Sequence, residues 1–118
     1  MKYLCLIYQD ESAAQKVPNA ELEKIYREYL ALTAGLKEAG QYLGSNRLQP
    51  TSTATTVRVR NGQLSVTDGP YAETKEQLGG YYLIEARDLN EAIQIAGKIP
   101  SARFGGVEVR PIWELQQP

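Results

Sequence analysis

The pattern of hydrophobic and polar positions predicts strands and helices in alternation along a single domain. Residues Tyr3–Tyr8 are almost wholly apolar and rich in aromatic and branched side chains, which favours a strand with both faces covered. A stripe at three- and four-residue spacing then predicts a helix that begins near Asn19, with Asn19 as its N-cap, and ends before Gly40. The members of this stripe are Leu22, Ile25, Tyr26, Tyr29, Leu30, Thr33 and Leu36.

A β-hairpin is predicted in the middle of the chain, after a second strand that begins within Gln41–Pro50. Thr55–Arg60 alternates between polar and apolar residues, and the strand pattern resumes over Gln63–Thr67. Asn61-Gly62 separates these two runs. Asn-Gly in this position favours a two-residue turn, because both central residues need positive φ.

The remaining segments predict a second helix between two strands. Asp88 is the expected cap of this helix, and Glu91 stands three residues later as in a capping box. The elements expected in order are a turn at Asp68–Pro70, a short helical turn within residues 72–78, a strand over Tyr81–Ala86, a helix that ends at Pro100 and a strand over Val107–Leu115. Val107, Val109 and Trp113 are expected on one face of that strand.

The order β-α-β, hairpin, β-α-β predicts an α+β fold, a ferredoxin-like sandwich with an inserted hairpin, over the single domain 1–118. Two helices cover only one face of an antiparallel sheet. Since Tyr3–Tyr8 gives the other face apolar side chains as well, a second copy of the chain is expected to cover it. The sequence therefore predicts a homodimer packed sheet to sheet.

Composition removes several function classes. The net charge is −1 with charges of both signs mixed along the chain, so we expect no nucleic-acid partner. The apolar run at the N-terminus is too short for a signal peptide or a membrane span, so we expect no membrane partner. One cysteine and no histidine argue against a disulfide, a zinc site or a redox metal, and fit a cytoplasmic protein. No glycine-rich phosphate-binding motif is present, and we expect no cofactor.

The segment Val66–Glu76, which reads VTDGPYAETKE, resembles the YCII-related family in the branch known for an Asp-Gly-Pro-Phe motif, with Tyr71 in place of the Phe. The opening MKYLCLIY and the segments 79–85 and 107–111 resemble strands of that family. The resemblance implies a dimeric α+β barrel. A few relatives with this barrel are small enzymes that act on aromatic ring products or lactones. Members of this branch also resemble proteins encoded near extracytoplasmic sigma factors, which implies a regulatory context. A His–Asp pair has been proposed as catalytic in some members, but this chain has no histidine to supply it.

Asp68 is the candidate catalytic residue, and two interpretations of it stay open. Its carboxylate is either the side chain of an Asx turn or a general base whose pKa burial raises. Tyr71 is either an aromatic plug over the core or part of the site, and Lys75 either belongs to a solvated turn or binds an anion.

Arginines and tyrosines provide the other candidate ligand contacts. Arg58 and Arg110 fall on the polar phases of two strands, where they form either interface ion pairs or a clamp for a carboxylate. The chain has eight tyrosines, which suit an interface or a ligand cavity equally well. The predicted substrate-binding set is Tyr8, Arg47, Arg58, Tyr71, Lys75, Tyr82 and Arg110. Cys5 is expected to be an inert core residue.

Two functions follow as hypotheses. The first is a cofactor-independent enzyme or binder that holds a small aromatic or acidic metabolite in a tyrosine-lined cavity between the sheet and the helices, with Asp68 as base. The second is a non-catalytic dimerisation module that acts through protein contacts, for example with transcription machinery, and uses Asp68 in turn hydrogen bonds. The sequence leaves open whether the chain is an enzyme.

Overall fold

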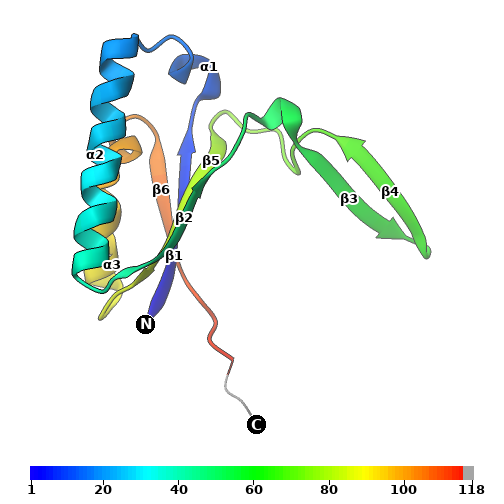
Figure 1. The fold of residues 1–118 in the computed structure, drawn as a ribbon. Coiled ribbons are helices and arrows are strands. Elements are labelled where there is room, and N and C mark those ends of the chain that lie inside the picture. The colour runs from blue at the N-terminus through cyan, green and yellow to red at the C-terminus, as the bar shows by residue number, and fades with distance from the viewer. Residues whose placement is uncertain (116–118) are drawn as a thin grey trace.

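The computed structural model describes residues 1–115 and shows an open antiparallel sheet with helices on one face and a hairpin that projects away on the other side (Figure 1). Its elements are β1 (Lys2–Gln9), α1 (Glu11–Ala14), α2 (Asn19–Glu38), β2 (Tyr42–Arg47), β3 (Thr55–Arg60), β4 (Gln63–Asp68), β5 (Gln77–Glu85), α3 (Leu89–Gly97) and β6 (Gly106–Pro111), with 3-10 helices at Thr51–Thr53 and Pro100–Arg103. Of the predicted domain 1–118, residues 116–118 lie outside the described residues. No helix within residues 1–115 is long and apolar enough to cross a membrane.

The main sheet has the strand order β2-β5-β1-β6, and each neighbouring pair is antiparallel. In the register, Cys5 of β1 lies opposite Tyr82 of β5 and Val109 of β6. The predicted α+β class is confirmed. The four strands form an open sheet and do not close into a barrel within one chain.

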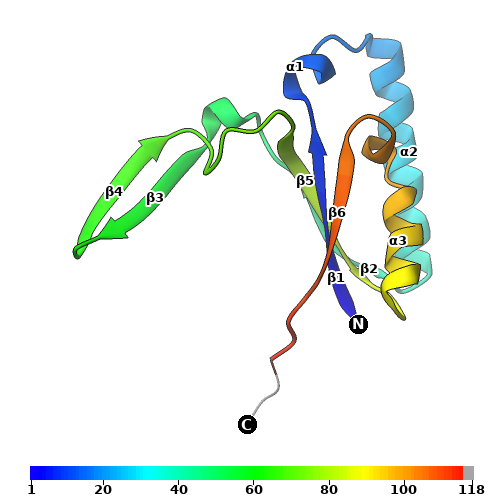
Figure 2. The ribbon, with the colours of Figure 1, turned by 180° about the vertical axis from the view of Figure 1, so that it is seen from behind.

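The core lies between the sheet and the helices. Tyr3, Cys5 and Ile7 of β1 are buried, whereas Leu4, Leu6 and Tyr8 alternate with them and are half-buried. Side chains of a strand point alternately to its two faces, so the second set lies on the face opposite α2 and α3, which we call the open face (Figure 2). In one chain, β1 is therefore fully covered only on its helix side. The other buried apolar residues are Leu36, Tyr82, Ile84, Ala86, Ala92, Ile95, Ala96 and Ile99.

Helix α2 follows the predicted stripe, but Leu36 is its one buried member, and Ile25, Tyr29 and Thr33 are half-buried. Leu22, Tyr26 and Leu30 are 43%, 64% and 53% exposed, because the sheet contacts a narrower face of the helix than the stripe covers. The predicted N-cap is wrong by one residue, since Pro18 is the cap and Asn19 is the first helical residue. Gly40 has φ of 72°, as expected of the residue that follows a helix end.

The later elements confirm the turn and cap predictions and correct two others. Asn61 and Gly62 have φ of 53° and 74° between β3 and β4. The Asp88 carboxylate accepts the Glu91 N–H at 2.9 Å, which caps α3. The short helical turn predicted within residues 72–78 is wrong, because the segment is irregular and β5 already begins at Gln77. The last strand ends at Pro111, so Trp113 lies beyond it and is 88% exposed.

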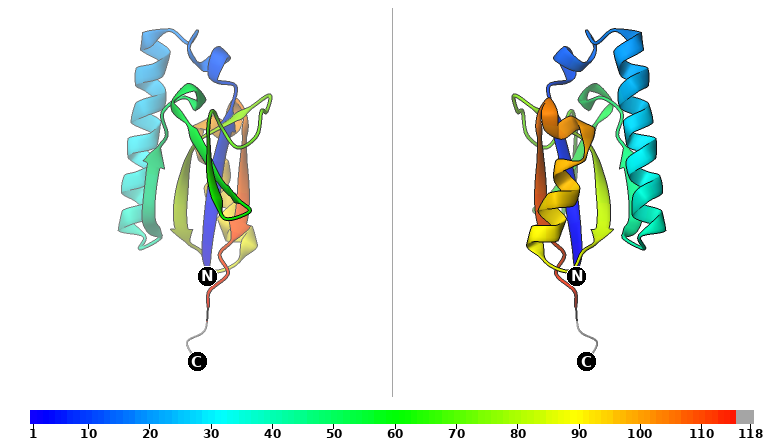
Figure 3. Two further views of the ribbon diagram at one scale, coloured as in Figure 1. Left: turned by 90° about the vertical axis from the view of Figure 1, so that its right-hand side faces the viewer. Right: turned by 90° about the vertical axis from the view of Figure 1, so that its left-hand side faces the viewer.

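The hairpin of residues 55–68, which we call the arm, leaves the main sheet and forms a separate two-stranded ribbon (Figure 3). Hydrogen bonds fix its root. The Gly69 N–H donates to the Ala54 carbonyl at 2.8 Å, and the Thr56 hydroxyl donates to the Gly69 carbonyl at 2.9 Å. The Glu11 carboxylate accepts both the Thr51 N–H at 2.9 Å and the Thr51 hydroxyl at 2.8 Å.

Candidate functional site

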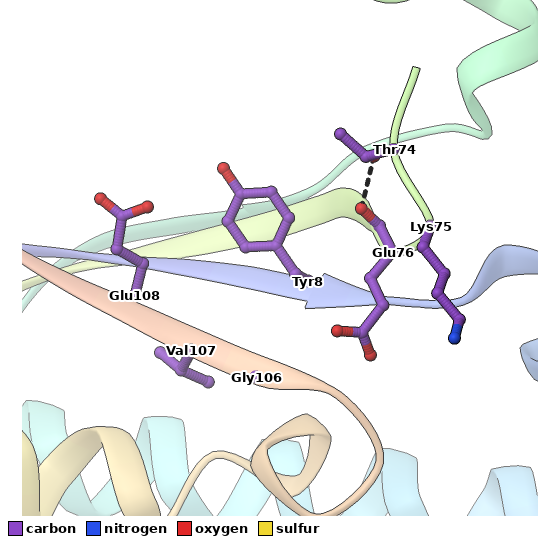
Figure 4. A pocket seen from close by; sticks show the side chains of 7 residues that line it. All are labelled: Tyr8, Thr74, Lys75, Glu76, Gly106, Val107 and Glu108. Carbon is purple, nitrogen blue, oxygen red and sulfur yellow. Dashed lines mark hydrogen bonds between the residues drawn. The ribbon is translucent and has the colours of Figure 1, made fainter. Parts of the chain in front are cut away.

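A depression of about 520 Å³ lies on the open face, where β1, β6 and the segment before β5 meet (Figure 4). We call it the Tyr8 depression. It is open to solvent, and its walls come from three separate parts of the chain. The lining residues are Tyr8 from β1, Thr74, Lys75 and Glu76 from the segment before β5, and Gly106, Val107 and Glu108 from β6.

The strand register positions Tyr8 and Glu108. Tyr8 lies opposite Gly106 of β6, and Glu108 lies opposite Leu6. Tyr8 and Glu108 therefore project from the open face together, while Val107 points toward the helices (Figure 4). Gly105 permits this close approach of the two strands, because a Cβ there would be 2.0 Å from the Tyr8 carbonyl oxygen.

Charged side chains line the depression beside Tyr8, and the Lys75 side chain extends away from the Tyr8 ring (Figure 4). Glu76 and Glu108 present carboxylates, and Lys75 presents an ammonium group. The Arg110 guanidinium donates from Nε to Glu108 Oε2 at 2.7 Å, since the two residues are neighbours on one face of β6. The Thr74 hydroxyl donates to the Glu76 carbonyl at 2.5 Å, which holds the segment before β5 in its turn. The depression thus offers an aromatic face, hydrogen-bond acceptors and a cation.

The structure brings together only part of the predicted site. Tyr8 and Lys75 both line the Tyr8 depression, and Arg110 contacts it through Glu108. Arg47 lies elsewhere, in a second depression of about 300 Å³ lined also by Leu48, Gln49 and Pro50. Arg47 and Tyr8 therefore do not share a site within one chain.

Tyr82 belongs to the core on the helix side of the sheet. It is 4% exposed, and its hydroxyl is 2.7 Å from the Thr33 hydroxyl. Its ring stacks on Tyr29 with centroids 6.3 Å apart and meets Tyr42 edge-on at 6.2 Å. Burial raises the pKa of Tyr82, and the hydrogen bond with Thr33 opposes this rise. These tyrosines pack against one another in the region where the sequence predicted a tyrosine-lined cavity.

Asp68, Tyr71 and Arg58 gather at the arm root. Asp68 ends β4 opposite Thr55 and is exposed, so the burial expected of a general base is absent in a single chain. Within residues 1–115 its carboxylate has no hydrogen-bond partner. A backbone bond from Gly69 to Ala54 and the bond from the Thr56 hydroxyl to Gly69 hold the turn instead. Tyr71 is 77% exposed, so of its two interpretations the aromatic plug over the core does not hold in a single chain. The Arg58 guanidinium lies 4.8 Å from the Tyr71 ring centroid.

Sequence reasoning missed five residues of the Tyr8 depression. Glu108 shares the strand phase of Arg110, and this spacing was the one signal that pointed to it. The others have no comparable signal, because their positions depend on an irregular segment and on strand register. They are Thr74, Glu76, Gly106 and Val107. Within the described residues, no group of three or more acidic or cysteine side chains is placed to hold a metal ion.

Comparisons with known proteins agree with the sequence resemblance. A family model described as the YCII-related domain matches residues 1–116. A protein of Rhizobium meliloti (strain 1021), described as uncharacterized, is 41% identical over 114 residues, which cover 95% of this chain and 92% of that protein. The predicted family is confirmed, and the description of the Rhizobium meliloti protein names no activity.

Proposed function

The chain belongs to the YCII-related domain family, and we propose that it is a homodimer that binds a small aromatic or acidic molecule in the Tyr8 depression without a cofactor. In this proposal the order β2-β5-β1-β6 is that of a ferredoxin-like domain, and two such domains stack their open faces as a dimeric α+β barrel. Half-buried side chains such as Leu4 and Leu6 on the open face support the stacking, because a monomer leaves them partly in water.

The observation that carries the proposal is the meeting of an aromatic ring, carboxylates and a cation in one depression. The Tyr8 ring provides a face for a planar ligand, and aromatic pairs add about 0.5–1.5 kcal/mol beyond their buried area. Lys75 suits a ligand carboxylate or phenolate, and Glu76 and Glu108 accept hydrogen bonds from hydroxyl groups. A phenol, a small aromatic acid or a lactone of similar shape fits this set of groups.

Turnover in this site would use a carboxylate as general base, since the chain has no histidine. Glu76 and Glu108 line the depression, whereas Asp68 lies on the arm. Asp68 can act as the base only if the arm of one copy brings it to the Tyr8 depression of the other copy. Asp68→Asn should then leave folding unchanged and lower turnover, and equal turnover would remove Asp68 from the site.

A thermal-shift screen with phenols, small carboxylic acids and lactones tests the binding proposal. A ligand at about 100 times its dissociation constant stabilises the folded state by about 2.7 kcal/mol, so selective ligands raise the Tm. Tyr8→Ala should abolish the shift, and Tyr26→Ala, on the exposed side of α2, should keep it. Lys75→Gln should weaken the binding of carboxylic acids more than the binding of neutral phenols. A shift that survives both Tyr8→Ala and Lys75→Gln would place the ligand elsewhere.

The second candidate, a non-catalytic interaction module, is favoured by the row of exposed apolar residues on α2. Leu22, Tyr26 and Leu30 follow one another at four-residue spacing and remain 43–64% exposed. Such a row suits the surface of another protein. This candidate predicts that no compound of the three classes raises the Tm of the wild-type chain.

A further inference from the structure

The arm has one apolar face and one polar face. Val57 pairs with Val66, and Val59 pairs with Leu64, so all four side chains project to the same side of the ribbon. These four side chains are 56%, 59%, 60% and 69% exposed, respectively. The opposite face carries Arg58, Arg60, Gln63 and Ser65.

An isolated ribbon of this kind is not expected to persist in water. Two paired strands are marginally stable alone and need a further strand or a packed layer to become stable. The arm extends away from the helices and the main sheet of its own chain (Figures 1 and 2). Another molecule must therefore pack against the apolar face of the arm, and that molecule must be present wherever the chain folds.

The arm root is built to hold the ribbon in one direction. Two hydrogen bonds from Thr51 to the Glu11 carboxylate fasten the segment that leads into β3. The backbone bond from Gly69 to Ala54 closes the other side of the root, and Arg58 lies over the Tyr71 ring. A projection held in advance loses little conformational entropy when it docks, which is expected of a binding element rather than a mobile loop.

A second copy of this chain meets the requirements for that cover. It is present in equal amount whenever the arm forms, and it carries an open face that lacks cover of its own. The charges are also complementary. Among residues 1–115 neither Asp68, which shares the ribbon face of Val57 and Val66, nor Lys75 at the open face has an ion-pair partner. In a dimer with twofold symmetry, the arm of each chain docks on the other chain in one and the same interface.

We propose that the arm docks on the open-face side of a second copy, with Val57, Val59, Leu64 and Val66 buried between the two chains. The proposal rests on the homodimer of the proposed function and adds the element that fastens it. It also gives Asp68, which lies on the docking side of the arm, a route to the second copy's Tyr8 depression that a single chain does not offer.

Sedimentation velocity of the full chain across the micromolar range tests the docking. The wild type should be a dimer, and Val59→Ser with Leu64→Ser should raise its dissociation constant at least about 100-fold, because both apolar side chains return to water in both copies. The control is Leu89→Ser with Ile93→Ser, which removes two half-exposed apolar side chains from α3 and should leave the constant unchanged. A monomeric wild type, an unchanged arm variant or an equally weakened control would overturn the proposal.

Hydrogen exchange of the wild type gives a second readout that does not depend on a variant folding. Amides of Val57–Val66 should exchange more slowly above the dimer dissociation constant than below it, and concentration-independent exchange would overturn the proposal. The proposed ligand site is tested independently of the docking of the arm. If a ligand raises the Tm and Tyr8→Ala abolishes that rise, the Tyr8 site is supported even when the arm test fails. If the arm variant dissociates but no ligand raises the Tm of the wild type, only the docking of the arm is supported.

Discussion

Glu11 should be the side chain whose loss loosens the arm most. Its carboxylate accepts the Thr51 N–H at 2.9 Å and the Thr51 hydroxyl at 2.8 Å, and so links the start of α1 to the segment that enters the arm. Hydrogen bonds to a charged acceptor contribute about 1.5–3 kcal/mol each when buried. Glu11 is only half-buried, so water replaces part of each bond, and Glu11→Ala should lower the free energy of unfolding by about 2–3 kcal/mol in total.

The measurement is urea unfolding followed by circular dichroism at one fixed protein concentration, because the stability of a dimer depends on concentration. Thr51→Val removes only the hydroxyl and should cost about half as much as Glu11→Ala. The double variant should lose less than the sum of the two single variants, since both remove the same contact.

Glu23→Ala is the matched control, because Glu23 is exposed on α2 and has no ion-pair partner among the described residues. It should change stability by less than about 0.5 kcal/mol. If Glu11→Ala falls within the same limit, or if the double variant is additive, the arm root is not held by this carboxylate.

Three further predictions concern the core and the approach of β6 to β1. Gly105→Ala should destabilise the chain by about 3 kcal/mol or more, because its Cβ would meet a carbonyl oxygen at 2.0 Å, whereas Gly106→Ala has open space and should cost under about 1 kcal/mol in urea unfolding. Burial raises the pKa of the Cys5 thiol from 9.0 to about 11, so iodoacetamide should modify it at neutral pH only after unfolding. Since the unfolded thiol loses its proton first, stability should fall as pH rises from about 9 to 11, and a Cys5→Val variant with the same alkaline slope would refute this. Tyr82→Phe should cost about 1 kcal/mol by denaturant melting, because the Thr33 hydroxyl loses its partner, and an unchanged midpoint would show that water replaces that bond.

Local signals in the sequence were sufficient for the hairpin and for the start of α3. Asn61-Gly62 specifies its turn through backbone conformation, and Asp88 caps its helix through its own side chain, so neither depends on distant parts of the chain. The family could also be predicted from the sequence, because the segment Val66–Glu76 that carries the resemblance is continuous.

The candidate site could be predicted only in part, because strand register decides which residues share a face. Tyr8 and Tyr82 are both tyrosines on neighbouring central strands, but Cys5 lies opposite Tyr82 in the register, which turns Tyr82 to the helices and Tyr8 to the open face. A shift of one residue in the pairing of β5 with β1 would turn Tyr82 to the open face as well. The direction of the arm was equally hidden, since Thr55–Arg60 alternates in the same way whether the strand joins the main sheet or leaves it.

We propose above that the open face beside Tyr8 is the ligand-binding surface of the protein. The most direct test is a ¹⁵N NMR titration of the full chain with the phenol, acid or lactone that gives the largest thermal shift. We expect saturable chemical-shift changes at the amides of Tyr8, Lys75 and Glu108 and none along α2. Saturable changes confined to α2, or no saturable change with any compound of the three classes, would contradict it.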